Sequence, residues 1–248
     1  MRYLLLLAGS VLLIAASPAQ DARQLMEQGR DREAFQLIEK SAQSGDPDAV
    51  DYLAWFHDEG RLVPQDHARA VELYRRAAQA GNRHAQWRLG VMLDLGLGTT
   101  EAPAEAFVWI KKAADQGSSS AYASLGVMYA MGRGVSVDYQ ASQRSYRKAA
   151  ELGERHGFYG VGILYARGEG VPQDLTEALA WMLVAASLGD QDATKAIEGN
   201  GFRDADGPSS TERARQIAKE FGLRLEFKFE DQRPPPGRTT NSKVPIDV

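Results

Sequence analysis

The amino-acid sequence predicts an all-α protein, a solenoid of stacked helix-turn-helix units, and two observations predict it. One phrase recurs at a fixed interval: LGVMLDLGLG begins at Leu89, LGVMYAMGRGV at Leu125 and VGILYARGEGV at Val161, each 36 residues after the last. Glycine keeps the same register along the chain, at Gly45, Gly81, Gly117, Gly153 and Gly189. A short unit with one apolar face cannot bury that face alone, so units of this kind stack on one another.

Each unit divides into two predicted helices. The first runs from about Ala49 to Glu59 in the first copy and ends at Gly60, a residue able to adopt the left-handed conformation that terminates helices. The second helix, HARAVELYRRAAQA, has apolar or small residues at the three- and four-residue spacing of one buried face. An aspartate before the second helix can cap it by accepting backbone hydrogen bonds, and these residues are Asp66, Asp138 and Asp174. The second unit has Ala102 at this position, so we expect its second helix to lack the cap.

Small residues at one position of every first helix predict close packing within each unit. This position holds Ala54, Gly90, Gly126 and Gly162. A larger side chain there would push the two helix axes apart. We expect Leu89 and its equivalents, with Trp109 and Trp181 on the second helices, to fill the remaining space.

The repeated phrase resembles the Sel-1-like repeat, a relative of the tetratricopeptide repeat with a longer unit. The family signature is roughly A-x-x-x-L-G-x-x-Y-x-x-G-x-G-V-x-x-D, followed by A-x-x-W and A-A-x-x-G. The segment AYASLGVMYAMGRGVSVD, from Ala121 to Asp138, matches it almost fully. The resemblance implies four units, at residues 49–84, 85–120, 121–156 and 157–192, wound into a right-handed superhelix. A half-unit within residues 20–48 precedes them and serves as the N-terminal cap.

Residues 1–19 are predicted to be a secretory signal peptide. A basic start at Arg2 precedes an apolar run from Leu4 to Ala16, and Ser17 and Ala19 stand at the −3 and −1 positions of a cleavage site. A retained membrane anchor is the alternative, but this run falls short of the roughly 18 to 20 residues that span a bilayer. We therefore expect a periplasmic or secreted protein without a stable membrane anchor after cleavage.

Residues 193–230 are predicted to close the other end of the array. The segment GPSSTERARQIAKEF indicates a helix that begins at Ser210 or Thr211 and buries one face, made by Ala214, Ile217, Ala218 and Phe221. The segment LRLEFKFE, residues 223–230, alternates apolar and charged residues with the period of a strand. It is either a packed tail or a strand that pairs with a partner or a second copy. Residues 231–248 are Pro-rich and polar, which predicts a disordered tail.

Composition and motifs argue against nucleic-acid binding and catalysis. The 29 basic and 33 acidic residues form no clustered basic face of the kind that contacts phosphates. The absence of Cys excludes disulfides, thiolate metal sites and a Cys nucleophile. The sequence has no His-Glu-x-x-His run, no Gly-Lys-Ser/Thr phosphate loop and no Gly-x-Ser-x-Gly elbow. We expect no enzymatic activity, no cofactor and no metal.

The candidate site is the concave face of the solenoid. In tetratricopeptide relatives this face of the first helix lines a groove, so the resemblance implies that the same positions here contact a protein or peptide partner. The predicted partner-binding residues are Trp55, Asp58, His84, Trp87, Val91, Val127, Met131, His156, Tyr159, Ile163 and Arg167. Aromatic anchors in a groove usually supply much of the peptide-binding energy. Packing against neighbouring helices is the alternative role for the rings of Trp55, Trp87 and Tyr159.

The predicted function is therefore that of an exported, non-enzymatic scaffold or adaptor that binds a protein or peptide on its concave face. One alternative is a hydrolase of cell-wall material or β-lactams, because a branch of the Sel-1-like family has been described as binding and hydrolysing penicillin. Members of that branch have a Cys pair in each repeat, whereas this chain has no Cys. The other alternative is a structural subunit that self-associates through residues 223–230. The oligomeric state is not predicted.

Overall fold

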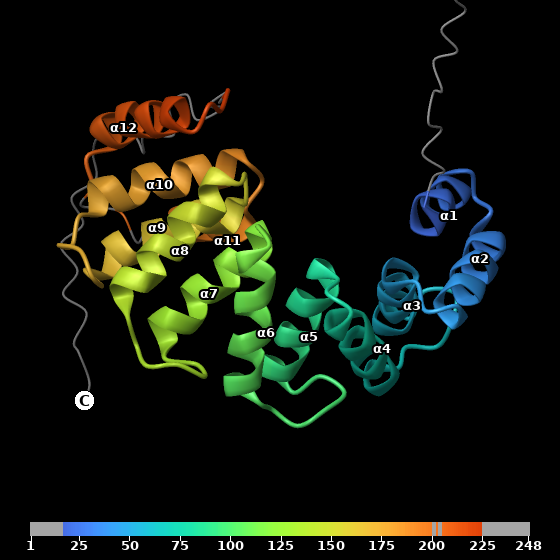
Figure 1. Ribbon diagram of the computed structural model, residues 1–248. Helices are drawn as coiled ribbons and strands as arrows, with labels where there is room; N and C mark the ends of the chain where they lie inside the picture. Colours follow the sequence, from blue (N-terminus) through green and yellow to red (C-terminus); the bar gives the residue numbers. More distant parts are fainter. Residues whose placement is uncertain (1–16, 200–201, 203–204, 225–248) are drawn as a thin grey trace, which may run out of the picture.

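The computed structural model describes residues 17–199, 202 and 205–224, and these residues form twelve helices and no strand. The helices are α1 Pro18–Glu27, α2 Asp31–Gln43, α3 Pro47–Glu59, α4 His67–Gln79, α5 Arg83–Leu95, α6 Pro103–Asp115, α7 Ser119–Met131, α8 Tyr139–Glu151, α9 Arg155–Arg167, α10 Leu175–Ser187, α11 Gln191–Glu198 and α12 Gly207–Glu220. Figure 1 shows them following one another along an arc, with α1 and α12 at its two ends. The predicted all-α solenoid is confirmed.

The first helices of the four units, α3, α5, α7 and α9, form the inner row of this arc. Each packs against the second helix of its own unit and against the second helix of the unit before, as α5 does against α6 and α4. Helix α7 also contacts both α5 and α9, whereas the second helices α4, α6 and α8 make no comparable contact with one another. Since the members of an inner row lie closer together than those of an outer row, α3, α5, α7 and α9 make the concave face.

Glycine ends each first helix, and an aspartate begins the second helix in three of the four units. Gly60 ends α3 in the left-handed conformation, with φ of +65°. The capping aspartates each accept a backbone N–H of the following turn at 2.8–2.9 Å, and they are Asp66, Asp138 and Asp174. Helix α6 has no side-chain cap, because Ala102 stands at that position. These features agree with the predictions.

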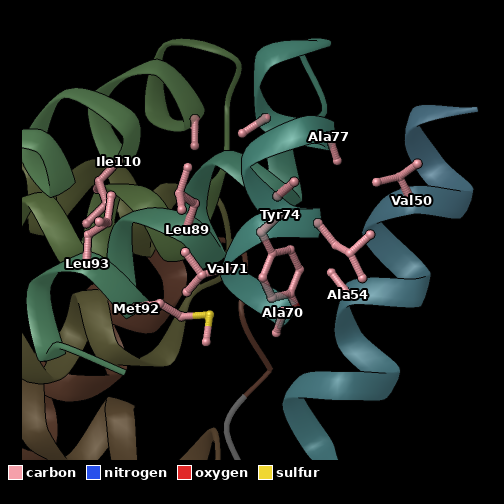
Figure 2. Packing of buried hydrophobic residues seen from close by; sticks show 14 of the residues in the cluster. Val50, Ala54, Ala70, Val71, Tyr74, Ala77, Leu89, Met92, Leu93 and Ile110 are labelled. Atoms are coloured by element: carbon pink, nitrogen blue, oxygen red, sulfur yellow. The ribbon is translucent and has the colours of Figure 1, made fainter. Parts of the chain in front are cut away.

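Small side chains on the first helices let the two helices of a unit approach closely. A Cβ added to Gly90 of α5 would lie 2.4 Å from Cγ1 of Ile110 in α6, so only glycine fits there without a shift of the neighbour. Figure 2 shows the equivalent contact in the first unit, where Ala54 of α3 lies beside Tyr74 of α4. Of the side chains predicted to fill the core, Leu89 and Trp181 are fully buried, whereas Trp109 is only partly buried.

Two helices start earlier than predicted. Helix α12 begins at Gly207 rather than at Ser210 or Thr211, because Asp206 caps it by accepting the N–H of Ser209 at 3.4 Å, and a proline occupies its first turn. Helix α3 likewise begins two residues before its predicted start, behind the capping residue Asp46. Proline is favourable at the start of a helix, because the backbone N–H that it lacks would have no hydrogen-bond partner within the helix. The predicted buried face of α12 is confirmed for Ala214, Ile217 and Ala218.

The N-terminal helix α1 begins close to the predicted signal-peptide boundary. The hydroxyl of Ser17 accepts the N–H of Gln20 at 3.3 Å, and the side chain of Gln20 accepts the N–H of Ser17 at 3.2 Å. The predicted cleavage point after Ala19 therefore lies within the first turn of α1. Residues 1–16, the predicted signal-peptide core, lie outside the described residues. None of the described helices is long and apolar enough to cross a membrane.

At the C-terminal end, Leu223 and Arg224 are the only described residues of the predicted strand-like segment, and they have no strand structure. Residues 225–230 and the predicted disordered tail, residues 231–248, lie outside the described residues. The described chain ends against the core, because Leu223 donates its N–H to the carbonyl of Ala218 at 2.8 Å. The ring of Phe221 also packs against Phe158, with centroids 5.0 Å apart.

Candidate partner-binding pocket

A pocket of about 520 Å³ lies between α5, α7 and α9, the inner row of helices. The apolar part of its lining comes from these helices and from α8, and consists of Trp87, Ala123, Val127, Tyr146, Tyr159, Gly160 and Ile163. The polar part consists of Ser120, Ser124, Glu154, Arg155, His156 and Asp192. The pocket is referred to below as the concave pocket.

The concave pocket exists because one position of the repeat becomes smaller along the array. This position holds Arg88 in α5, Ser124 in α7 and Gly160 in α9. The Arg88 guanidinium covers Tyr74 of the preceding unit, with its Cζ 5.9 Å from the ring centroid. Gly160 lies so close to Tyr146 that an added Cβ would be 2.3 Å from that ring. The ring of Tyr146 therefore packs directly against Gly160, and because Gly160 has no side chain to cover this part of the groove, both residues lie in the lining of the pocket.

Hydrogen bonds within the fold hold the polar groups around the pocket. The indole Nε1 of Trp87 donates to Ser124 Oγ at 3.1 Å, and Ser120 Oγ donates to Glu154 Oε2 at 3.1 Å. The other oxygen of Glu154 caps α9 by accepting the N–H of His156 at 3.5 Å. Because these groups already have partners, an occupant of the pocket would gain mainly from burial of its apolar surface.

Two histidines beside the pocket each lie against a carboxylate. Nδ1 of His156 lies 2.8 Å from Oδ2 of Asp190, whose side chain is fully buried. Nδ1 of His84 lies 2.9 Å from Oδ1 of Asp51, and its ring centroid is 5.8 Å from that of Trp87. We infer that the hydrogen bond with Asp51 fixes the orientation of the His84 imidazole, and that His84 in turn supports the Trp87 wall of the pocket. The contact of His156 with Asp190 is close but lacks hydrogen-bond geometry, since Oδ2 of Asp190 has no hydrogen-bond partner.

The two tyrosines of the pocket remain protonated at neutral pH. Burial raises the pKa of Tyr146, and the nearby charge of Arg167 opposes this effect without cancelling it. Burial also raises the pKa of Tyr159, helped by the carboxylates of Asp192 and Asp190. Both phenol groups are therefore neutral and able to donate a hydrogen bond.

The concave pocket contains five of the eleven residues predicted to bind a partner: Trp87, Val127, His156, Tyr159 and Ile163. The other six lie outside it. Trp55 packs against Tyr52, with ring centroids 5.5 Å apart, and the Arg61 guanidinium lies over its ring. Val91, Met131 and Arg167 are on the same inner row of helices, and Met131 is 66% exposed. His84 is held by its hydrogen bond with Asp51, and Asp58 by its contacts with Arg88, Tyr74 and His67.

Asp58 does not face the groove, because it is 3% exposed and its carboxylate is occupied within the fold. Its Oδ1 lies 3.2 Å from Nδ1 of His67, and its Oδ2 accepts the hydroxyl of Tyr74 at 3.3 Å and a hydrogen bond from the Arg88 guanidinium. Burial by itself would lower the pKa of Arg88, but the hydrogen bond to Asp58 and the further interactions with Asp58 and Tyr74 together outweigh this effect, and the pKa is raised. Asp58 therefore ties α3 to α4 and to α5 of the next unit.

Sequence reasoning missed Tyr146, Gly160 and Glu154 as pocket residues. Tyr146 lies on α8, a second helix, whereas the predicted groove positions were all on first helices. Glu154 precedes α9, outside the positions assigned to the groove. The available signal was the replacement of Arg88 by Gly160 at equivalent positions, which shows that the fourth unit lacks the side chain that lines the groove in the second.

The described residues include no group of three or more His, Asp or Glu side chains that could hold a metal ion. The carboxylate of Glu154 already accepts two hydrogen bonds, from Ser120 and from the backbone of α9. The chemistry that the pocket favours is therefore burial of an apolar group with hydrogen bonds at its edge.

Comparison with known families agrees with the repeat register. The family model described as Sel1 repeat matches residues 30–46, 47–82, 83–118, 119–154 and 159–190, more than half of the chain. Its first match is a partial unit, as the predicted half-unit is. Its full units begin two residues before the predicted boundaries, at the first residues of α3, α5 and α7.

Solved structures with the same fold include two bacterial proteins of moderate sequence similarity. A Sel1 repeat protein from Oxalobacter formigenes is 28% identical, with a TM-score of 0.65, and the match covers 82% of this chain and 84% of that one. The protective antigen c5321 of uropathogenic Escherichia coli strains is 29% identical, with a TM-score of 0.62; the match covers 83% of this chain but 49% of the antigen. A search of the curated proteins gave no match.

A more distant structure shares the fold alone. The immunity protein PA5088 from Pseudomonas aeruginosa is 20% identical, with a TM-score of 0.54, and the match covers 85% of each chain. At this identity the likeness concerns the path of the helices. The side chains of the concave pocket have to be interpreted from this chain itself.

Proposed function

Because the chain belongs to the Sel1 repeat family, whose members are typically protein-interaction scaffolds, we propose that it binds a protein partner on its concave face. One large apolar side chain of that partner enters the concave pocket. The observation that carries the proposal is the concave pocket itself, which lies over Tyr146 and Gly160 on the inner row of helices. The scaffold acts by docking and performs no catalysis.

The size and lining of the pocket fit this role. Its volume of about 520 Å³ lies inside the range of roughly 300–1,000 Å³ typical of ligand pockets. Val127 is 41% exposed, and Tyr159 and Ile163 are half-buried, so apolar surface is available to a partner. Burial of one large apolar side chain stabilises a complex by about 2–3 kcal/mol, enough to make this pocket the dominant contact of an interface.

A charge placed in the pocket should abolish capture of the partner. We expect Val127→Asp to lower the recovery of crosslinked partner from the native envelope fraction at least tenfold, because the new carboxylate must lose its hydration when an apolar group enters. The measurement is a crosslinking pull-down with quantified bands, after circular dichroism has shown that the variant is folded.

The matched control is Val108→Asp. Val108 is 50% exposed, similar to Val127, but it lies on α6 in the outer row. This variant should capture the partner as the native protein does. Equal capture by both variants, and by Tyr159→Ser, would place the partner on another surface and contradict the proposal.

Export of the protein is the second part of the proposal, and it rests on the composition of residues 1–19. The sequence of the mature N-terminus tests it. Protein recovered from the periplasm or the medium should begin at Gln20, whereas an uncleaved chain recovered from the cytoplasm would contradict export.

A further inference from the structure

The last residues of the four first helices form a second row on the concave side. These residues are Glu59 of α3, Leu95 of α5, Met131 of α7 and Arg167 of α9, and they occupy one position of the repeat. Their side chains are all exposed, between 54% and 66%. We call this set the terminal row. It has an acidic residue at one end, two apolar residues in the middle and a basic residue at the other end.

The terminal row continues the apolar surface of the concave pocket. Val127 and Ile163 line the pocket, and each lies four residues before a member of the row, Met131 and Arg167. Residues four apart on a helix lie on one face, one turn from each other. A partner segment that enters the pocket is therefore within reach of the terminal row.

The charges at the two ends remain available to a partner. Glu59 lies 3.9 Å from Nη2 of Arg88, a group whose hydrogen bond goes to Asp58. Arg167 lies 3.8 Å from Glu169. Exposed pairs at such distances contribute at most about 1 kcal/mol, so a partner charge can replace them.

Other charges near the terminal row are engaged elsewhere. Arg133, from the loop after α7, binds Asp94 with its Nε 2.9 Å from Oδ1. Arg61, from the loop after α3, lies 3.7 Å from Asp31. The field along the row is therefore set mainly by Glu59 at one end and Arg167 at the other.

We propose that the terminal row binds an amphipathic helix of the partner, with a basic residue against Glu59, two apolar residues against Leu95 and Met131, and an acidic residue against Arg167. This proposal rests on the proposed function. Helix α7 contacts both α5 and α9, and packed helices lie roughly 8–10 Å apart, so the row members on these three helices are spaced by about one helix diameter. We assign the same repeat spacing to Glu59 of α3. Residues seven apart in a helix are separated by about 10.5 Å and share a face. In a strand, residues about 10 Å apart lie three positions apart and face opposite sides. A helix of about 22 residues therefore matches all four positions.

A displayed library of 22-residue helix-forming peptides tests the proposal directly. Four face positions, seven residues apart, vary among Lys, Glu, Leu and Gln. On the native protein we expect enrichment of peptides with Leu at the two central positions and opposite charges at the ends. On Glu59→Lys the enriched peptides should have Glu at both ends, and on Arg167→Glu they should have Lys at both ends. Each exchange should change the affinity of a synthesised peptide about fivefold, as expected for one exposed ion pair.

Two further variants make the outcome specific. The double variant Glu59→Lys/Arg167→Glu should return the preference to opposite end charges. Arg144→Glu, an exposed residue of α8 in the outer row, should leave the selection unchanged. The terminal-row proposal is wrong if the charge reversals at Glu59 and Arg167 leave the enriched peptides unchanged, or if no peptide is enriched.

The same peptides separate this proposal from the proposed function. If peptides bind Val127→Asp more weakly but their affinity does not depend on the charges at positions 59 and 167, the pocket proposal is supported and the terminal-row proposal is refuted. If the affinity of the peptides depends on the charges at positions 59 and 167 but is the same for Val127→Asp as for the native protein, the terminal-row proposal is supported and the role of the pocket is refuted.

Discussion

Replacing Gly134 with alanine should lower the free energy of unfolding by about 3 kcal/mol. Gly134 has φ of +69°, and an added Cβ would lie 2.0 Å from the carbonyl oxygen of Pro103 at the start of α6. The left-handed conformation costs a non-glycine residue roughly 1–2 kcal/mol, and overpacking costs roughly 1–3 kcal/mol more. Because the obstructing atoms belong to the backbone, no side-chain rotation can relieve the overlap. Denaturant unfolding followed by circular dichroism measures the loss.

Gly153→Ala is the matched control for this prediction. Gly153 has φ of +82° and nothing within 4 Å of an added Cβ, so it shares the backbone strain without the close approach. We expect a loss of only about 1 kcal/mol for this variant. Equal losses for the two variants would mean that the left-handed conformation, and not the approach of the loop to the preceding unit, explains the requirement for glycine.

The first unit shows what happens when the close approach is relaxed. The position of Gly134 in the repeat is occupied by Gly98 in the second unit and by Leu62 in the first. Gly98 approaches the backbone of His67 as closely as Gly134 approaches Pro103, with 2.2 Å from an added Cβ to the carbonyl carbon. Leu62 keeps a positive φ of 66° with a side chain that is 44% exposed. Its side chain has room to extend into solvent, so the fold tolerates the strain there.

Much of the fold could be predicted from the sequence because the same packing constraint recurs every 36 residues. Gly90 must be small because Ile110 lies against it, and each copy of the unit repeats that constraint. Helix starts were harder to predict, as at α12. Asp206 and the proline in the first turn belong to a single copy, and residues of this kind are equally common in loops.

The candidate site was predicted only in part, since it depends on pairs of residues from neighbouring units. Helical spacing identified Val127, Tyr159 and Ile163, which do line the concave pocket. It could not show that Tyr146 of α8 packs against Gly160 of α9 and lines the pocket with it, because that requires knowing which residues meet across the interface between units. The same limit applies to Asp58, which helical spacing placed in the groove and which pairs instead with Arg88 of the next unit.

The buried ion pair of Asp58 and Arg88 should be the most costly polar contact to break. We expect Asp58→Ala to lower the free energy of unfolding by about 3 kcal/mol or more, because removal of one partner leaves the Arg88 guanidinium in a largely buried site without its carboxylate. Arg88 is 22% exposed, and its Nε is already buried without a hydrogen-bond partner. Urea unfolding of the native protein and the variant at equal protein concentration measures the loss.

Replacing Arg88 as well should then recover part of the free energy of unfolding that Asp58→Ala loses. Neutral residues occupy these positions in other units: Ala130 replaces Asp58 at the interface that has Gly160 in place of Arg88, and Ser124 replaces Arg88 at the interface that has Asp94 in place of Asp58. We therefore expect Asp58→Ala/Arg88→Ser to be more stable than Asp58→Ala alone, by about 2 kcal/mol, because no charge is left buried without a partner. Additive losses would show that the two residues stabilise the interface independently. Arg88 also lies 5.7 Å from the ring centroid of Trp87. Arg88 therefore links the Asp58 ion pair to the Trp87 wall of the concave pocket, and we expect Asp58→Ala to weaken partner capture as well as stability.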